Sequence, residues 1–242
     1  MRALRIGLIL LVVLGGLAFA ADRVAVGMAE GEIASKVRSS QGLDSEPSVS
    51  IKGFPFLTQL VGKKLDRVDL EMDTYTVQVD DQTGTVDDLV IRLDDVKLEN
   101  NYERAVAARA SGGGVISYAE MARLTGDGDS TFGVSFGYAG EGQIEVRVTV
   151  MGRTVGPTMI GDLDVDGDLV SVSIDDIPSF SDIPVIGSIP GIEDQIRQRV
   201  DQDRQISGLP SGVELEGLKA TEDGVTLSVA GTDVQLTGAA SE

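Results

Sequence analysis

One five-residue segment matches a motif that carries a catalytic serine in other proteins. Residues 133–137 read G-V-S-F-G, which fits the G-x-S-x-G pattern of a nucleophile turn. Such a serine needs a base, usually histidine, and a strand-to-helix turn that exposes its hydroxyl. The chain contains no histidine, and the apolar residues around Ser135 alternate as they do in a strand. The sequence therefore predicts a structural strand here and no catalytic residue.

A second group of polar side chains imitates half of a calcium-binding loop. Asp162, Asp164 and Asp166, followed by Gly167, match the first positions of an EF-hand. The twelfth position of that loop must supply a bidentate glutamate, but Ser173 stands there. The flanking segments alternate as strands rather than helices. We predict a solvated hairpin and no metal site, with a weak surface calcium site as the alternative.

The composition closes most other routes to catalysis. The chain has no cysteine, which excludes thiolate nucleophiles, thiolate metal sites and disulfides. It has neither a phosphate-binding glycine loop nor a dinucleotide fingerprint. The 39 Asp and Glu offer many carboxylate pairs, so a carboxylate-dependent glycan hydrolase stays an alternative. We predict a binding protein that is not an enzyme and needs no cofactor.

The charge limits the possible partners. The formal net charge is −19, and a field of that sign repels nucleic acid and anionic surfaces at long range. We therefore predict no nucleic-acid binding. Simple electrostatic adsorption on an acidic bilayer is disfavoured for the same reason.

The N-terminus has the pattern of an export signal. Arg2 and Arg5 precede an apolar run from Ile6 to Phe19, which ends in the small-residue pattern Ala18-Phe19-Ala20. A helix that crosses a bilayer needs about 20 apolar residues, and this run is shorter. The sequence predicts an exported protein.

Two outcomes of export are open. Cleavage after Ala20 would remove residues 1–20 as a signal peptide and leave residues 21–242 as a single domain. The alternative is an uncleaved anchor, because the two arginines inside and the acidic domain outside would hold the same orientation. No later segment is apolar for long enough to span a membrane.

The mature chain reads as one helix followed by many strands. Val26, Ile33 and Val37 recur at helical intervals between Asp22 and Gln41, and Gly42 is placed as a stop. Residues 48–51 predict a short strand, and residues 53–60 a loop or a single helical turn. Alternating apolar sets then predict half-buried strands: Val68-Leu70-Met72, Leu89-Ile91-Leu93, Phe132-Val134-Phe136-Tyr138, Ile144-Val146-Val148-Val150, Val170-Val172-Ile174 and Val225-Leu227-Val229.

Two further helices and two hairpin turns complete the pattern. We expect helices over residues 117–124 and 192–206, and type I′ turns at Asp166-Gly167 and Asp223-Gly224. The predicted fold class is α+β, with long curved antiparallel sheets and two or three flanking helices.

Residues 52–67 combine apolar side chains with a local group of cations. The apolar side chains lie where an irregular connection would normally be polar. Apolar residues that enter a membrane interface, surrounded by a collar of basic residues that meet the headgroups, suit an anionic lipid surface. The alternative is that Phe54 and Phe56 plug the end of the core. The candidate lipid-contact residues are Lys52, Phe54, Pro55, Phe56, Leu57, Leu60, Lys63, Lys64 and Arg67.

The same segment carries a resemblance to a known family. Ile51–Leu60, which reads I-K-G-F-P-F-L-T-Q-L, resembles the signature of the LmeA family of phospholipid-binding proteins, found in the envelopes of actinobacteria. The helix start at Ser117–Met121 and the turn at Ser207–Val213 fit the family as well. The resemblance covers essentially the whole mature chain.

The resemblance implies a fold and a function. The fold would be an elongated clam-shell of curved β-sheet similar to the TULIP lipid-binding domains, with an apolar groove for acyl chains. The ligand would be an anionic phospholipid of the phosphatidylinositol type, bound at a membrane surface for lipid or lipoglycan maintenance or transfer. The alternative function is a structural or interaction protein of the envelope whose acidic surface binds a basic partner.

Overall fold

The computed structural model describes residues 2–102, 104–125, 132–151, 153–174, 194, 204–207, 209 and 211–237. The chain divides into two compact units, each of which is discontinuous in sequence. Unit 1 consists of Met1–Met72, Val90–Ala110 and Gly231–Glu242, and unit 2 of Asp73–Leu89 and Ser111–Ala230.

The fold class is α+β, as predicted, with one large antiparallel sheet of 11 strands. The strand order is β10-β11-β4-β3-β2-β9-β8-β7-β6-β5, and β1 pairs with β2. The elements are α1 (Arg2–Gln41), β1 (Ser48–Lys52), α2 (Phe56–Val61), β2 (Lys64–Val79), β3 (Gln82–Glu99), η1 (Asn100–Tyr102), β4 (Arg104–Ile116), α3 (Tyr118–Thr125), β5 (Phe132–Gly140), β6 (Gln143–Val150), β7 (Arg153–Asp166), β8 (Leu169–Ile174), β9 (Arg204–Ser207), β10 (Val213–Ala220) and β11 (Val225–Thr237).

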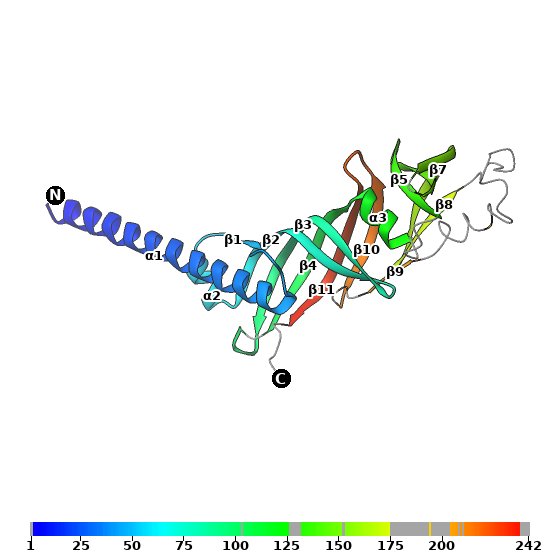
Figure 1. Ribbon diagram of the computed structural model, residues 1–242. Helices are drawn as coiled ribbons and strands as arrows, with labels where there is room; N and C mark the ends of the chain where they lie inside the picture. The colour runs from blue at the N-terminus through cyan, green and yellow to red at the C-terminus, as the bar shows by residue number, and fades with distance from the viewer. Residues whose placement is uncertain are drawn as a thin grey trace. The chain divides into compact units, whose positions relative to one another are not determined.

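The predicted helix from Asp22 and the apolar run before it form one continuous helix, α1. The side chains of residues 4–20 are exposed, and Figure 1 shows this half of α1 extending away from the strands of unit 1. Within the described residues, α1 is the helix that is long and apolar enough to cross a membrane. It ends at Gly42, whose φ of +63° lets the Leu43 N–H donate to the Arg38 carbonyl at 3.0 Å.

The C-terminal half of α1 packs on β1 and α2 through the face that the sequence predicted. Val26 and Ala34 are buried, and Ile33 and Val37 are half-buried beside them. The Glu30 carboxylate accepts a hydrogen bond from the Ile51 N–H at 2.7 Å. Because β1 pairs with β2 through Ile51 and Val68, this contact satisfies a donor on the outer edge of β1.

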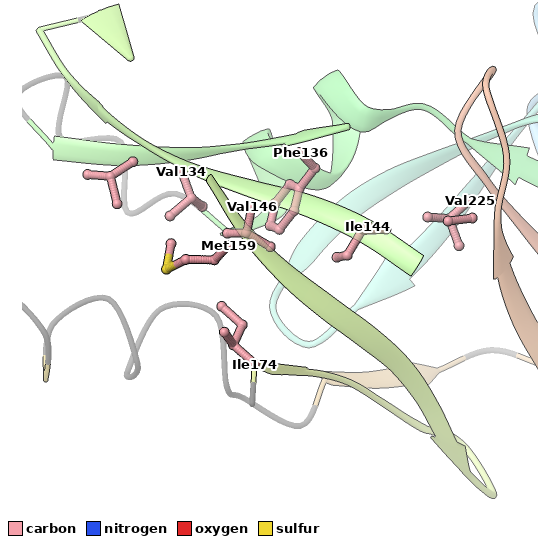
Figure 2. Close-up of a cluster of buried hydrophobic side chains, with 9 residues drawn as sticks. Val134, Phe136, Ile144, Val146, Met159, Ile174 and Val225 are labelled. Carbon is pink, nitrogen blue, oxygen red and sulfur yellow. The ribbon is translucent and has the colours of Figure 1, made fainter. Parts of the chain in front are cut away.

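Unit 2 is built around a core of β-branched residues. Ile144, Val146 and Val148 point inward from β6 and are fully buried. In Figure 2, Ile174 points from β8 toward the side chains of Val146 and Met159. The Ala220 N–H donates to the Gly142 carbonyl at 3.2 Å, so the end of β10 is bonded to the turn between β5 and β6.

Most predicted strands are confirmed, with shifted boundaries. Residues 204–206, the end of the predicted helix over 192–206, belong to β9 instead, and the rest of that segment lies outside the described residues apart from Asp194. The two predicted type I′ turns are wrong. The first turn is Gly167-Asp168, one residue later than predicted, and only Gly167 has the positive φ that a type I′ turn needs at both central residues. The second is a four-residue connection, residues 221–224, between β10 and β11. Residues 117–124 do form α3, shifted by one residue.

Strand β4 was not predicted, because glycines interrupt its pattern. A Cβ at Gly113 would lie 2.7 Å from the Leu227 carbonyl oxygen, and one at Gly114 would lie 2.5 Å from Cγ1 of Val86. Neighbouring strands therefore approach β4 so closely that only glycine fits. The glycines are a packing feature of the sheet.

Candidate functional site

The signature segment forms the connection between β1 and β2 in unit 1, and this connection contains α2. We call residues 53–63 the signature turn. Gly53 opens it with a φ of +96°, and a Cβ there would lie 2.5 Å from Oδ2 of Asp66. The Gln59 Oε1 accepts from the Asp66 N–H at 2.8 Å, and the Leu98 N–H donates to the Lys63 carbonyl at 2.9 Å. These bonds fix the C-terminal end of the turn on β2 and β3, and the Gln59 Nε2 donates to the Lys52 carbonyl at 3.3 Å at its start.

The two phenylalanines of the signature turn face opposite environments. Phe56, the first residue of α2, is 2% exposed and belongs to the core of unit 1. Phe54 is 59% exposed. Leu57 and Val61, which follow on α2, are also exposed, Val61 by 84%. Phe54, Leu57 and Val61 therefore present apolar surface to solvent, and we call these three residues the apolar tip.

Asp22 of α1 holds the start of α2. Pro55 precedes α2 and offers no side-chain cap. Instead, Oδ1 of Asp22 accepts from the Leu57 N–H at 2.8 Å, while Oδ2 lies 2.6 Å from the guanidinium of Arg23. Asp22 is 2% exposed. A buried carboxylate requires such partners, so Asp22 is a specific link between α1 and the signature turn.

Aromatic and cationic side chains extend this link to the tip. The ring of Phe54 lies 5.6 Å from the ring of Phe19, measured between centroids. The guanidinium carbon of Arg23 lies 5.4 Å from the Phe54 centroid and 5.9 Å from the Phe19 centroid. Both distances are within the range of cation–π attraction.

Three of the four predicted collar cations have acidic partners. Lys52 lies 3.8 Å from Asp69, Lys64 lies 2.8 Å from Asp95, and Arg67 lies 2.8 Å from Asp94. The hydrogen bond to Asp95 raises the pKa of Lys64, and the hydrogen bond to Asp94 raises the pKa of Arg67. Both cations stay protonated, but their charge is locally compensated.

Lys63 is the cation of this group that has no carboxylate partner among the described residues. Its Nζ lies 5.8 Å from the ring centroid of Tyr102. The Tyr102 hydroxyl donates to the Leu60 carbonyl at 3.3 Å, which ties η1 to α2. Lys63 is separated from α2 by Gly62 alone and is exposed, so its charge lies on the same turn as the apolar tip.

The two units differ sharply in charge. Unit 1 contains 13 Lys and Arg and 14 Asp and Glu, which gives a formal net charge of −1. Unit 2 contains 7 Lys and Arg and 25 Asp and Glu, which gives −18. Nearly all the negative charge of the chain therefore belongs to the unit that lacks the signature turn.

The other sequence motifs lie on ordinary strands of unit 2. Ser135 is in β5 opposite Arg147 of β6, so it does not have the strand-to-helix geometry of a nucleophile turn. Asp162 accepts from Gln143 at 2.9 Å, and Asp164 accepts from Ser173 at 3.1 Å. In the described part of the chain, no group of three acidic side chains is arranged to hold a metal ion.

The sequence reasoning missed the residues that connect α1 to the signature turn. Asp22 lies one helical turn before Val26, on the face that the apolar spacing assigns to the core. An acidic residue on that face was a usable signal for a buried partner. Val61 was also missed, because it is a single apolar residue beyond the signature.

Comparison with known proteins gives one match. A family model described as LmeA-like phospholipid-binding matches residues 20–230, which is most of the chain. No curated protein and no solved structure matches. The matched range includes Asp22 and the whole signature turn, but it begins after Phe19.

Proposed function

Since the chain belongs to the LmeA-like phospholipid-binding family, we propose that it is an exported cell-envelope protein that binds anionic phospholipid. Phosphatidylinositol-type lipids are the proposed ligands, and lipid or lipoglycan maintenance or transfer is the proposed role. The observation that carries this proposal is the match over residues 20–230. The export pattern before Ala20 supports the location.

The apolar tip is the proposed point of contact with a membrane surface. Exposed apolar side chains on a short turn favour insertion at the boundary between headgroups and acyl chains. Full burial of a Phe, Leu or Val side chain is worth about 1.5–3 kcal/mol, so partial insertion of Phe54, Leu57 and Val61 is worth a few kcal/mol in total. Lys63 would add about 1 kcal/mol beside an anionic lipid.

The proposed membrane contact uses only some of the residues that the sequence predicted for lipid contact. Phe56 supports the turn from the core, and the charges of Lys52, Lys64 and Arg67 are paired with aspartates. We therefore assign insertion to Phe54, Leu57 and Val61, headgroup attraction to Lys63, and positioning to Pro55, Leu60 and the paired cations.

The acyl chains are proposed to lie in an apolar groove of the β-structure. The inward faces of the strands are mostly valine, leucine and isoleucine in both units. Aliphatic walls suit hydrocarbon and offer no polar group that an acyl chain would leave unsatisfied.

Native mass spectrometry tests the proposed function. The full chain is extracted from its host in mild detergent and released intact in the gas phase. Phospholipid should copurify, with anionic species enriched over their share of the host lipids. A protein that carries no phospholipid and also fails to bind vesicles of phosphatidylcholine and phosphatidylinositol would refute the proposal.

The charge of unit 2 favours a second candidate function. A formal net charge of −18 on one unit would bind a basic partner by an interaction that salt weakens. Pull-down with a cationic polymer at low and high salt distinguishes this role, because lipid binding through apolar contacts would survive high salt.

A further inference from the structure

We propose that the membrane contacted by the signature turn is the one that holds the protein's own N-terminal helix. In this arrangement α1 is retained as an anchor, and Phe19, Arg23 and Phe54 lie at the boundary between hydrocarbon and headgroups. The inference rests on the proposed function and specifies its partner: the protein takes its lipid from the leaflet in which it is anchored.

The length of the apolar part of α1 sets where that boundary falls. From Leu4 to Ala21 the helix has one charged residue, Arg5, at its start. The stretch is 18 residues long, and α1 contains an 18-residue segment that is apolar enough to cross a membrane. At 1.5 Å per residue it covers about 27 Å, close to the hydrocarbon thickness of a bilayer. The far boundary therefore falls just before Asp22.

The side chains at that boundary are the ones that contact the signature turn. An arginine near the end of a transmembrane helix reaches the headgroups while its stem stays on apolar surface, and a phenylalanine beside it can stay in the hydrocarbon. Phe19 and Arg23 occupy these positions, and the Phe54 ring lies against both. An embedded α1 therefore brings the exposed Phe54 ring to the edge of the hydrocarbon, where its apolar surface leaves water.

Asp22 can lie at this depth because protein groups satisfy its carboxylate. A carboxylate at the edge of the hydrocarbon is unfavourable unless protein groups satisfy it. Here the Leu57 N–H and the Arg23 guanidinium bind both of its oxygens, and the side chain is buried. The start of α2 is thereby held against the helix at the point where it would leave the membrane.

The charge of unit 1 supports the same location. An embedded α1 places Arg2 and Arg5 at the opposite face of the bilayer, and the rest of unit 1 has 11 Lys and Arg and 14 Asp and Glu. Its formal net charge of −3 opposes approach to an anionic leaflet far less than the −18 of unit 2 does. Val24 and Met28, the next exposed apolar residues of α1, continue the apolar surface beyond Ala21. Cleavage after Ala20 would remove Phe19 and leave the Phe54 ring without its aromatic partner.

The experiment measures the N-terminus and the depth of the turn in the same protein. The full chain is expressed with its natural N-terminus, recovered from membranes and analysed by intact mass. The chain has no cysteine, so a fluorophore can be attached at a single introduced cysteine. The two labelled variants are Thr58→Cys on α2 and Asp81→Cys in unit 2, both at exposed positions. Each labelled protein is reconstituted in phosphatidylcholine–phosphatidylinositol vesicles with quencher lipids brominated at shallow or deep acyl positions.

The expected result is an intact mass that includes Phe19 and quenching of the label at residue 58 by the shallow quencher. The label at residue 81 should not be quenched. A mature N-terminus at Ala21, or equal absence of quenching at residues 58 and 81, would overturn the inference. Copurified phospholipid is scored separately: its presence with an N-terminus at Ala21 leaves the proposed function standing and removes only the anchor.

Discussion

Unit 1 and unit 2 are both β-rich, but they present opposite surfaces to their surroundings. Unit 1 is close to neutral and exposes Phe54, Leu57 and Val61 on one short turn. Unit 2 carries a formal net charge of −18 and has a buried cluster around Ile144 and Val146. Its exposed large apolar residues include Tyr138, Met151, Ile160 and Leu169. A chain-wide charge of −19 therefore hides a region that is suited to a lipid surface.

The difference in charge between the two units shows that the net charge of the chain does not describe each part of its surface. The expected repulsion from anionic lipid applies to unit 2, because most acidic residues belong to it. In unit 1 the acids Asp94 and Asp95 pair with Arg67 and Lys64. In the proposed lipid contact, burial of apolar surface, with little help from charge, would be the main attraction at the signature turn.

The largest expected effect separates the two phenylalanines of the signature turn. Phe56→Ala removes a core side chain and should lower the free energy of unfolding by about 3–5 kcal/mol. Phe54→Ala removes an exposed ring whose contacts are with Phe19 and Arg23, and should change it by about 1 kcal/mol. Urea unfolding followed by circular dichroism measures both, and equal losses would show that both rings are structural.

A substitution in unit 2 tests whether its core is independent of lipid contact. Ile144→Ala should cost about 2–5 kcal/mol of stability, because it leaves a cavity in the buried cluster. The protein that remains folded should bind vesicles as well as the unchanged chain does. Weaker binding by folded Ile144→Ala would place lipid contact in unit 2 and break the contrast between the units.

Salt distinguishes the apolar tip from a basic collar. If unit 2 is repelled by an anionic leaflet, raising the ionic strength to ~0.1 M screens that repulsion beyond about 10 Å and should strengthen vesicle binding a few-fold. A collar of free cations would instead lose affinity with salt. Flotation with phosphatidylinositol-containing vesicles at low and moderate salt gives the sign, and phosphatidylcholine vesicles serve as the control.

The smallest expected effect is an acid dependence in unit 2. The hydrogen bond from Arg123 lowers the pKa of Glu120 below 4.5, despite partial burial, and the Thr85 N–H donates to the same carboxylate at 2.7 Å. A depressed carboxyl pKa stabilises the fold above pH 4.5, and this contribution is lost as the pH falls through the folded-state pKa. The melting temperature of the unchanged chain should exceed that of Glu120→Gln at neutral pH, and the gap should shrink as the pH falls below 4.5 and through the folded-state pKa.

The periodic elements were predictable because their signals are local. The spacing of Val26, Ile33 and Val37 predicted the packing face of α1, and period-two alternation predicted β6 with its three buried residues. The irregular apolar segment was expected to be a loop or a single turn of helix, and it contains the short helix α2.

The details of the candidate site were not predictable from local patterns. Phe54 and Phe56 are two residues apart, and only the start of α2 at Phe56 decides which ring enters the core. The pairing of Arg67 with Asp94 depends on the packing of β2 against β3 across 27 positions of sequence. The continuity of α1 through Ala20 was hidden because composition alone suggested two separate segments.

The most direct test of lipid contact through unit 1 compares charged substitutions on the exposed apolar residues of the two units. Phe54→Asp with Val61→Asp should weaken vesicle binding about tenfold or more, since loss of about 1.4 kcal/mol is a factor of ten. Met151→Asp, at a position that is 78% exposed in unit 2, should leave binding unchanged. Flotation of the full chain with anionic vesicles measures both, and equal binding by the two variants would contradict lipid contact through the signature turn.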